Sequence, residues 1–267
     1  MCASFCNLFS GSSGNSTLIR GKTRNILVDA GITGKGMEEA LRSVGQKPEE
    51  LDGILITHEH SDHIKGAGVL SRKYDIPLYA NEKTWAAMAD KIGNLHLKNM
   101  RTFVTGQDFY IGDLDILSFE IPHDAADPVG FVVYCGNVKM AVATDMGRFT
   151  KRVAEQLAGS DVLVLEANHD VEMLENGSYP QVLKNRILGG RGHLSNDTCA
   201  KALEHLVNHN VKRAYLGHLS KENNLPDLAY STVVNHLQAA GVSIGRDIEL
   251  GMTWRDRPGE MLHFGAE

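Results

Sequence analysis

Three histidines and one aspartate, which are common metal ligands, fall within the six consecutive residues His58-Glu59-His60-Ser61-Asp62-His63. They follow the apolar run GILIT at 53–57, which is typical of a buried strand, and they precede a segment with helical character. A turn at the end of a strand can bring such side chains to one point. Imidazole and carboxylate together suit Zn²⁺, Mn²⁺ or Fe²⁺ better than Ca²⁺ or a thiolate-binding ion. The alternative is a polar surface loop that is rich in histidine by chance.

This segment, ILITHEHSDHIKG at 54–66, resembles the HxHxDH signature of the metallo-β-lactamase superfamily and its usual surroundings. LVDAG at 27–31 resembles the family's upstream strand and turn with a buried aspartate, here Asp29. The resemblance runs over essentially the whole chain. It implies one α/β domain over residues 1–267, a four-layered αββα sandwich with a dinuclear metal site at the edge between its two sheets. We expect Asp29 to support the site without binding metal.

The remaining ligands follow from the same resemblance. His123 in EIPHDAADPVGF matches the third-motif histidine, Asp145 in AVATDMG matches the bridging carboxylate, and His218 in YLGHLS matches the last histidine. Each follows an expected strand, although His123 and His218 taken singly could be ordinary loop residues. The resemblance implies two divalent ions, Zn, Mn or Fe, with one held by His58, His60, His123 and Asp145 and the other by Asp62, His63, Asp145 and His218.

A histidine and a glutamate outside this set are candidates for acid catalysis. His193 in GRGHLS and Glu166 in LVLEANHD resemble a relay of RNase Z-like proteins and of cyclic phosphodiesterases, in which the histidine aids departure of the phosphate ester. The resemblance implies that a metal-bridging hydroxide, oriented by Asp62, attacks phosphorus while His193 assists the leaving oxygen. His169 is expected to be structural, with a place in the site as the alternative.

Several separated motifs together indicate a narrower branch of the superfamily. FSGSSGNST at 9–17, PHDAADPVGF, EANHD and GHLSNDT resemble the YycJ/WalJ-type branch, described as bacterial 5′→3′ exonucleases acting on DNA. The resemblance implies a phosphodiesterase whose partner is DNA, with no obligate protein partner. One alternative is a small-molecule hydrolase of the same fold, acting on a cyclic phosphodiester, thioester or lactone. Another is an accessory regulatory protein of a two-component system.

Four residues are candidates for contact with a DNA phosphate. Ser13 and Asn15 belong to a Gly/Ser/Asn loop, for which the ordinary interpretation is a hairpin turn and the functional one is phosphate binding. Arg191 and Lys221 lie close in sequence to candidate site residues, with a solvated charge as the alternative. Both belong to the stretch 184–221, which has seven basic and two acidic residues in a chain of net charge −6. We therefore expect a local basic groove.

Hydrophobic periodicity and turn signals predict the elements that must position these residues. Expected strands are 3–9, 15–20, 25–29, 53–57, 114–121, 130–136, 138–144, 161–167 and 213–216, and expected helices are 37–44, 64–74, 180–188, 195–209 and 226–240. The helix 195–209 has the clearest signal, because Ser195 is a candidate N-cap before an apolar stripe.

The composition, with 42% hydrophobic and 22% charged residues, is typical of a folded globular protein. The chain has no signal-peptide pattern and no apolar run of about 20 residues, so we expect no membrane partner. The cysteines, Cys2, Cys6, Cys135 and Cys199, form no CxxC pair and are expected to be reduced. These features favour a cytoplasmic protein.

Overall fold

The computed structural model describes residues 3–265, which divide into two compact units. Unit 1 holds residues 3–120, 125–138 and 254–265, and unit 2 holds residues 121–124 and 139–253. The single domain expected from the sequence stays a prediction. Cys6, Cys135 and Cys199 are buried and form no disulfide within residues 3–265, in agreement with the expected reduced state. Cys2 lies outside the described residues.

Unit 1 is built on a seven-stranded sheet with the order β14-β1-β2-β3-β4-β5-β6. The strands are β1 (Ala3–Phe9), β2 (Ser16–Arg20), β3 (Asn25–Val28), β4 (Gly53–Leu55), β5 (Leu78–Ala80), β6 (Met100–Thr102) and β14 (Leu262–Phe264). Neighbours pair antiparallel from β14 to β3 and parallel from β3 to β6. The parallel pairing brings the carboxyl ends of β3 and β4 to the same edge.

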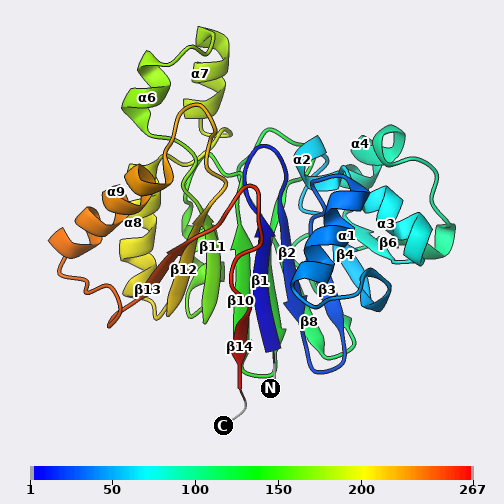
Figure 1. The fold of residues 1–267 in the computed structure, drawn as a ribbon. Coiled ribbons are helices and arrows are strands. Elements are labelled where there is room, and N and C mark those ends of the chain that lie inside the picture. Colours follow the sequence, from blue (N-terminus) through cyan, green and yellow to red (C-terminus); the bar gives the residue numbers. More distant parts are fainter. Residues whose placement is uncertain (1–2, 266–267) are drawn as a thin grey trace. The chain divides into compact units, whose positions relative to one another are not determined.

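Four helices of unit 1 are α1 (Gly34–Ser43), α2 (Ser61–Ile64), α3 (Ala67–Tyr74) and α4 (Glu82–Ile92), and Figure 1 shows α1, α3 and α4 beside the sheet. They cover it through one buried apolar cluster, to which the strands contribute Leu18, Leu27 and Ile54 and the helices Met37, Leu41, Leu70 and Met88. Unit 1 also contains the antiparallel strands β7 (Asp108–Ile111), β8 (Leu114–Glu120) and β9 (Val129–Cys135).

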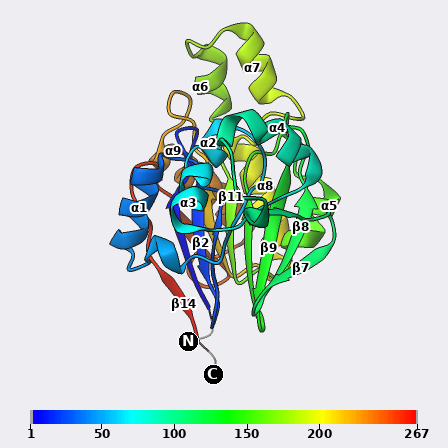
Figure 2. The ribbon, with the colours of Figure 1, turned by 90° about the vertical axis from the view of Figure 1, so that its right-hand side faces the viewer.

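Unit 2 is built on the parallel strands β10 (Val138–Ala143), β11 (Val162–Glu166), β12 (Arg213–Gly217) and β13 (Glu249–Met252). Its helices are α5 (Lys151–Leu157), α6 (Val171–Asn176), α7 (Gln181–Leu188), α8 (Asn196–Val207) and α9 (Pro226–Ala239). Figure 1 shows α8 and α9 beside the strands, and Figures 1 and 2 show α6 and α7 projecting from them as a two-helix arm. Ser195 caps α8 as predicted, since its side chain accepts from the backbone N–H of Thr198.

Two predicted helices differ in their bounds, and the strands and α-helices not predicted are β5, β6, β7, β13, β14, α4, α5 and α6. The helix expected at 37–44 begins at Gly34, because the Thr33 side chain caps it by accepting from the N–H of Gly36. The helix expected at 64–74 is divided into α2 and α3, and between them the N–H of Gly66 donates to the carbonyl of Ala30 (2.8 Å). Among the described residues, no helix has the length and apolarity needed to cross a bilayer.

Candidate metal centre

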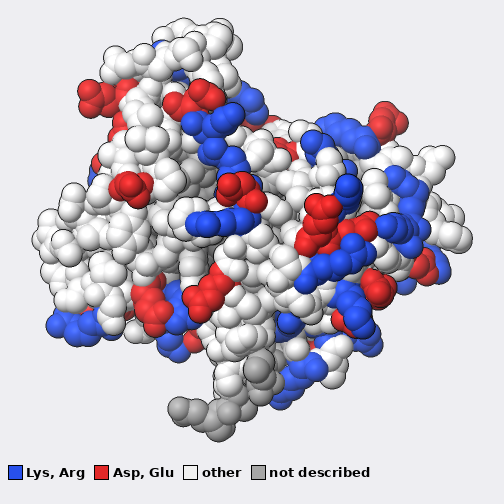
Figure 3. All heavy atoms as spheres, in the orientation of Figure 1, with Lys and Arg blue, Asp and Glu red and all other residues white. Residues whose placement is uncertain are grey.

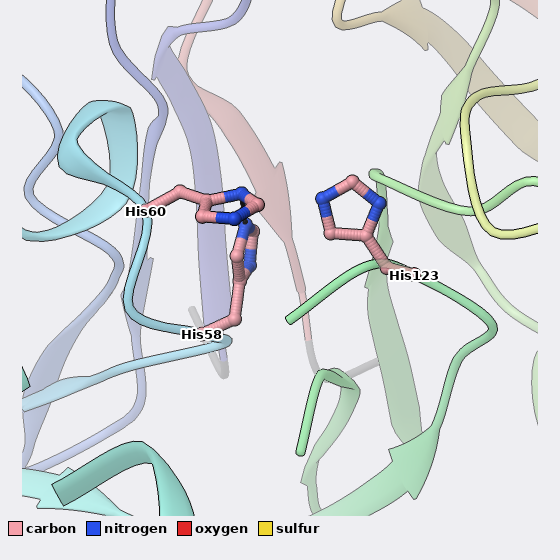
Figure 4. Close-up of side chains that lie close together, drawn as sticks. All are labelled: His58, His60 and His123. Carbon is pink, nitrogen blue, oxygen red and sulfur yellow. Dashed lines mark hydrogen bonds between the residues drawn. The ribbon is translucent and has the colours of Figure 1, made fainter. Parts of the chain in front are cut away.

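The HxHxDH residues of unit 1 form a tight turn between β4 and α2. His58 and His63 are fully buried, and Nε2 of His58 lies 3.1 Å from Nδ1 of His60. Figure 4 shows His58 and His60 on this turn, with their rings edge to face at a centroid distance of 4.6 Å. The rings of His58 and His63 are 4.0 Å apart. The structure thus gathers the imidazoles of this motif, as the sequence predicted.

Asp29 holds this turn from the end of β3. Its Oδ2 lies 2.7 Å from Nδ1 of His63, and its two oxygens accept from the backbone N–H and the hydroxyl of Thr57. A carboxylate on Nδ1 fixes the imidazole tautomer and leaves Nε2 as the atom suited to bind a metal. Burial raises the pKa of Asp29, and His63 and Thr57 oppose that shift. Asp29 therefore supports His63.

Backbone contacts fix the same turn. The N–H groups of Asn15 and Ala30 donate to the carbonyls of Asp62 and His63, each at 2.8 Å. At Gly31 the two segments approach so closely that a Cβ would lie 1.6 Å from the carbonyl oxygen of Asp62. Only glycine allows this approach, so the LVDAG segment packs directly against the backbone of the histidine turn.

The Gly/Ser/Asn loop also contacts this turn, through Asn15. Nδ2 of Asn15 donates to the carbonyl of Gly11 and lies 3.1 Å from Nε2 of His63, while its Oδ1 accepts from the N–H of Gly11. Asn15 is buried and its amide group is already engaged within the chain. Ser13, in contrast, is exposed. Of the two proposed phosphate contacts in this loop, Ser13 is the accessible one.

Unit 2 brings together five predicted site residues at the carboxyl ends of its strands. Asp145 follows β10, Glu166 ends β11 and His218 follows β12, so the parallel sheet places them along one edge. His123 and His193 come from loops, and Figure 4 shows His123 in the loop after β8. Oδ1 of Asp145 lies 3.4 Å from His218 Nε2, 3.7 Å from His193 Nδ1 and 3.9 Å from His123 Nε2.

Three residues that follow strands, one in unit 1 and two in unit 2, have a left-handed backbone. The φ angles are +61° at Asp29, +61° at Asp145 and +56° at His218, and only two other non-glycine residues in the described chain share this conformation. Such conformations cost about 1–3 kcal/mol each and persist where the surroundings impose them. Two of these residues are candidate ligands and the third is a supporting carboxylate, so this backbone conformation coincides with the candidate site.

The carboxylate of Glu166 contacts two histidines and two backbone N–H groups of the unit 2 cluster. Its Oε1 lies 2.7 Å from His193 Nδ1 and 2.9 Å from His218 Nδ1, and its Oε2 accepts from the N–H groups of Met146 and Leu194. Burial alone would raise the pKa of Glu166, but His193 and His218 lower it below the ordinary value. Conversely, burial would lower the pKa of His193, but Glu166 and Asp145 raise it above the ordinary value. Glu166 is therefore ionised and favours the protonated form of His193.

Asn168 provides a second support for His218 that was not predicted from the sequence. Nδ2 of Asn168 donates to the carbonyl of His218 (2.8 Å), and Nδ2 of Asn224 donates to the carbonyls of Ala167 and Asn168. Asn168 directly precedes His169 in the EANHD motif, so that motif was the available signal. His169 itself is buried, and within residues 3–265 neither of its ring nitrogens has a hydrogen-bond partner.

The basic stretch 184–221 does not form one continuous surface. Arg186, Lys212 and Arg213 make ion pairs with Asp124, Asp161 and Glu249, respectively. Arg191 and Lys221 are exposed. On the face drawn in Figure 3, Lys and Arg side chains alternate with Asp and Glu side chains. The charges available to a substrate are therefore local to individual loops.

Comparisons with known proteins agree with this architecture. A family model described as the beta-lactamase superfamily domain matches residues 24–219. The chain is 45% identical over 245 residues to exodeoxyribonuclease WalJ of Streptococcus pneumoniae D39, covering 91% of each protein. It is 42% identical over 246 residues to exodeoxyribonuclease YycJ of Bacillus anthracis, covering 92% of this chain and 93% of that protein.

Among solved structures, the metallo-β-lactamase fold protein YhfI of Bacillus subtilis superposes with a TM-score of 0.73 at 14% identity. The superposition covers 97% of this chain and all of that one. At this identity the likeness shows the fold alone. Two sheets flanked by helices, the predicted αββα class, are thereby confirmed.

Proposed function

Because the chain belongs to the β-lactamase superfamily, we propose that it is a metal-dependent phosphodiesterase acting on DNA as a 5′→3′ exonuclease. Support for the substrate comes from the two relatives with 45% and 42% identity, both named exodeoxyribonucleases and matched over nine-tenths of their length. Support for the chemistry comes from the contact between Glu166 and His193, which carries the proposal because it provides an acid for an ester oxygen. We also propose that the protein is located in the cytoplasm.

We propose two divalent ions per chain, Zn, Mn or Fe. Their ligands would be His58, His60, Asp62, His63, His123, Asp145 and His218. The residues fit such ions on chemical grounds, since the imidazole of His63 lies beside the carboxylate of Asp62 in unit 1 and that of His218 beside Asp145 in unit 2. Nδ1 of both His63 and His218 also contacts a carboxylate. When bound, the ions would neutralise phosphate oxygens and lower the pKa of water.

The chain's own residues would move the proton. Nδ1 of His193 is hydrogen-bonded to Glu166, so Nε2 is the atom that would donate a proton to the leaving oxygen. The side chain of His193 is 18% exposed, whereas that of Glu166 is fully buried, which leaves the imidazole accessible to substrate and the carboxylate shielded. General-acid assistance of this kind contributes about 10²–10⁴-fold to a rate.

The test is a substrate panel with Mn²⁺ present. Wild-type protein should degrade duplex DNA and hydrolyse bis-p-nitrophenyl phosphate, and it should leave a thioester and a lactone intact. Hydrolysis of a thioester or lactone, with no cleavage of either phosphodiester, would instead establish the small-molecule hydrolase. A protein inactive on the whole panel would favour the regulatory alternative.

A further inference from the structure

Two loops of unit 2 that carry site residues are locked together through their backbones. One loop follows Asp145, and the other leads to His193. At Gly147 a Cβ would lie 2.5 Å from the backbone of both Gly190 and Gly192, so the loops touch without intervening side chains. The N–H of Gly147 also donates to the carbonyl of Pro122 (2.9 Å). The positions of both loops are thereby fixed.

Each of these loops presents one exposed arginine beside its site residue. Arg148 lies three positions after Asp145, and Arg191 lies two positions before His193. Nε of Arg148 donates to the carbonyl of Gly190 (3.2 Å), the residue directly before Arg191. This bond anchors the guanidinium through one nitrogen and leaves its two Nη groups, with four N–H donors, to a ligand.

The charges of these two arginines are not neutralised within the chain. In residues 3–265 neither Arg148 nor Arg191 has an acidic partner, whereas Arg186, on the neighbouring helix α7, is paired with Asp124. The planar guanidinium of Arg148, which has no carboxylate partner, can donate two parallel hydrogen bonds to two oxygens of one phosphate group. Arg191 adds a second exposed positive charge on the adjoining loop, so the two loops together carry two cationic side chains in a chain of net charge −6.

We propose that Arg148, together with Arg191, binds a phosphate group of the DNA strand next to the bond that is cleaved. This inference rests on the proposed function and adds Arg148 to its substrate-binding residues. A phosphate held by the two loops is also held relative to Asp145 and His193, because the loops are fixed to one another. The arginines would therefore set the register of the strand and carry no base preference.

The experiment measures binding separately from cleavage. Labelled oligonucleotides are titrated with full-length protein in EDTA, by fluorescence anisotropy at several salt concentrations. Arg148→Ala should raise Kd about 10- to 100-fold, the range expected for a lost hydrogen bond to a charged group. It should also reduce the salt slope by about 0.7–0.9, the value for one phosphate contact. Arg148→Lys should recover the slope better than the affinity, because lysine keeps the charge without the planar fork.

The matched control is Lys151→Ala, three positions along the chain, where the lysine side chain is 92% exposed and 3.8 Å from Glu155. It should change Kd less than about twofold. Oligonucleotides with a 5′-phosphate and with a 5′-hydroxyl distinguish the two sources of the phosphate. An Arg148 effect limited to the 5′-phosphate identifies the terminal group, and an equal effect on both identifies an internal phosphodiester.

Unchanged Kd and slope in Arg148→Ala, or an equal loss in Lys151→Ala, would overturn the inference and leave the exonuclease proposal intact. Absence of DNA binding by the wild type would also overturn it. If wild-type protein binds DNA through Arg148 but does not degrade it with Mn²⁺, the exonuclease proposal fails and the phosphate site stands. Circular dichroism and Tm should be unchanged in both variants, because both side chains are exposed.

Discussion

Replacement of Glu166 by glutamine should affect both the proposed metal ligand His218 and the proposed acid His193. Four donors converge on the carboxylate: Nδ1 of His193 and His218 on one oxygen, and two backbone N–H groups on the other. An ionised carboxylate accepts all four, whereas an amide has only one acceptor oxygen. If that oxygen faces the backbone, the amide NH₂ faces both imidazoles. Their protons would then move to Nε2, the atom needed for metal binding at His218.

The magnitude follows from the lost interactions. A hydrogen bond to a charged group contributes about 1.5–3 kcal/mol, so two such bonds correspond to about 3–6 kcal/mol. Expressed in the transition state, that loss lowers kcat about 10²–10⁴-fold. Loss of a carboxylate that orients a ligand histidine should also weaken metal affinity about 10- to 100-fold. Glu166→Gln should therefore show both defects.

The assay combines steady-state kinetics on DNA with a metal titration of the same protein. Glu155→Gln is the control, because that side chain is 61% exposed on α5 and should leave kcat and metal affinity unchanged. If Glu166→Gln loses rate on DNA but binds metal like the wild type, the contact with His218 has no function. If neither kcat on DNA nor metal affinity changes, Glu166 does not support His193 and His218 as described.

Three further predictions follow from single residues. His193→Ala should keep the metal content of the wild type and lose about 10²–10⁴-fold in kcat on DNA. The loss of kcat should be smaller on bis-p-nitrophenyl phosphate, because its leaving group needs no proton. An equal loss on both substrates would exclude the acid role. In Gly31→Ala the new Cβ would lie 1.6 Å from the carbonyl oxygen of Asp62. This substitution should displace the histidine turn, lower Tm and reduce metal content. A normal Tm and a normal metal content would contradict the packing argument. Burial lowers the pKa of His169 to about 4, so between pH 6.5 and 4 the unfolded chain binds a proton that the folded chain does not. The free energy of unfolding should therefore fall by about 3 kcal/mol as the pH drops through that window, and denaturant titrations of His169→Leu should lack this component.

The parts of the fold that the sequence predicts best are those with a strong local signal. Strand β1 was predicted with its observed bounds, and α8 with its observed cap, because their apolar patterns and capping residues lie within one short window. Strands β5 and β6 and helix α4 were missed, since three-residue strands have no measurable period and α4 lies among charged residues.

The candidate site shows the same division between local and long-range information. Motif positions predicted that Asp145, Glu166, His193 and His218 would gather, and the structure brings them together within unit 2. The double role of Glu166 could not be predicted, because its contact with His218 spans 52 positions in the sequence. The engaged amide of Asn15 and the pairing of Arg186 with Asp124 likewise depend on contacts between distant segments.

The central claim is tested most directly by following duplex DNA labelled at either 5′ or 3′ ends, incubated with Mn²⁺ and the purified protein. We predict that wild-type protein releases the 5′ label at once in short products, while the 3′-labelled strand shortens progressively. The double variant His58→Ala/His60→Ala should leave both labels in full-length strands, because it lacks two of the proposed ligands. Degradation by the double variant at the wild-type rate, or failure of the wild-type protein to degrade either substrate, would contradict the account.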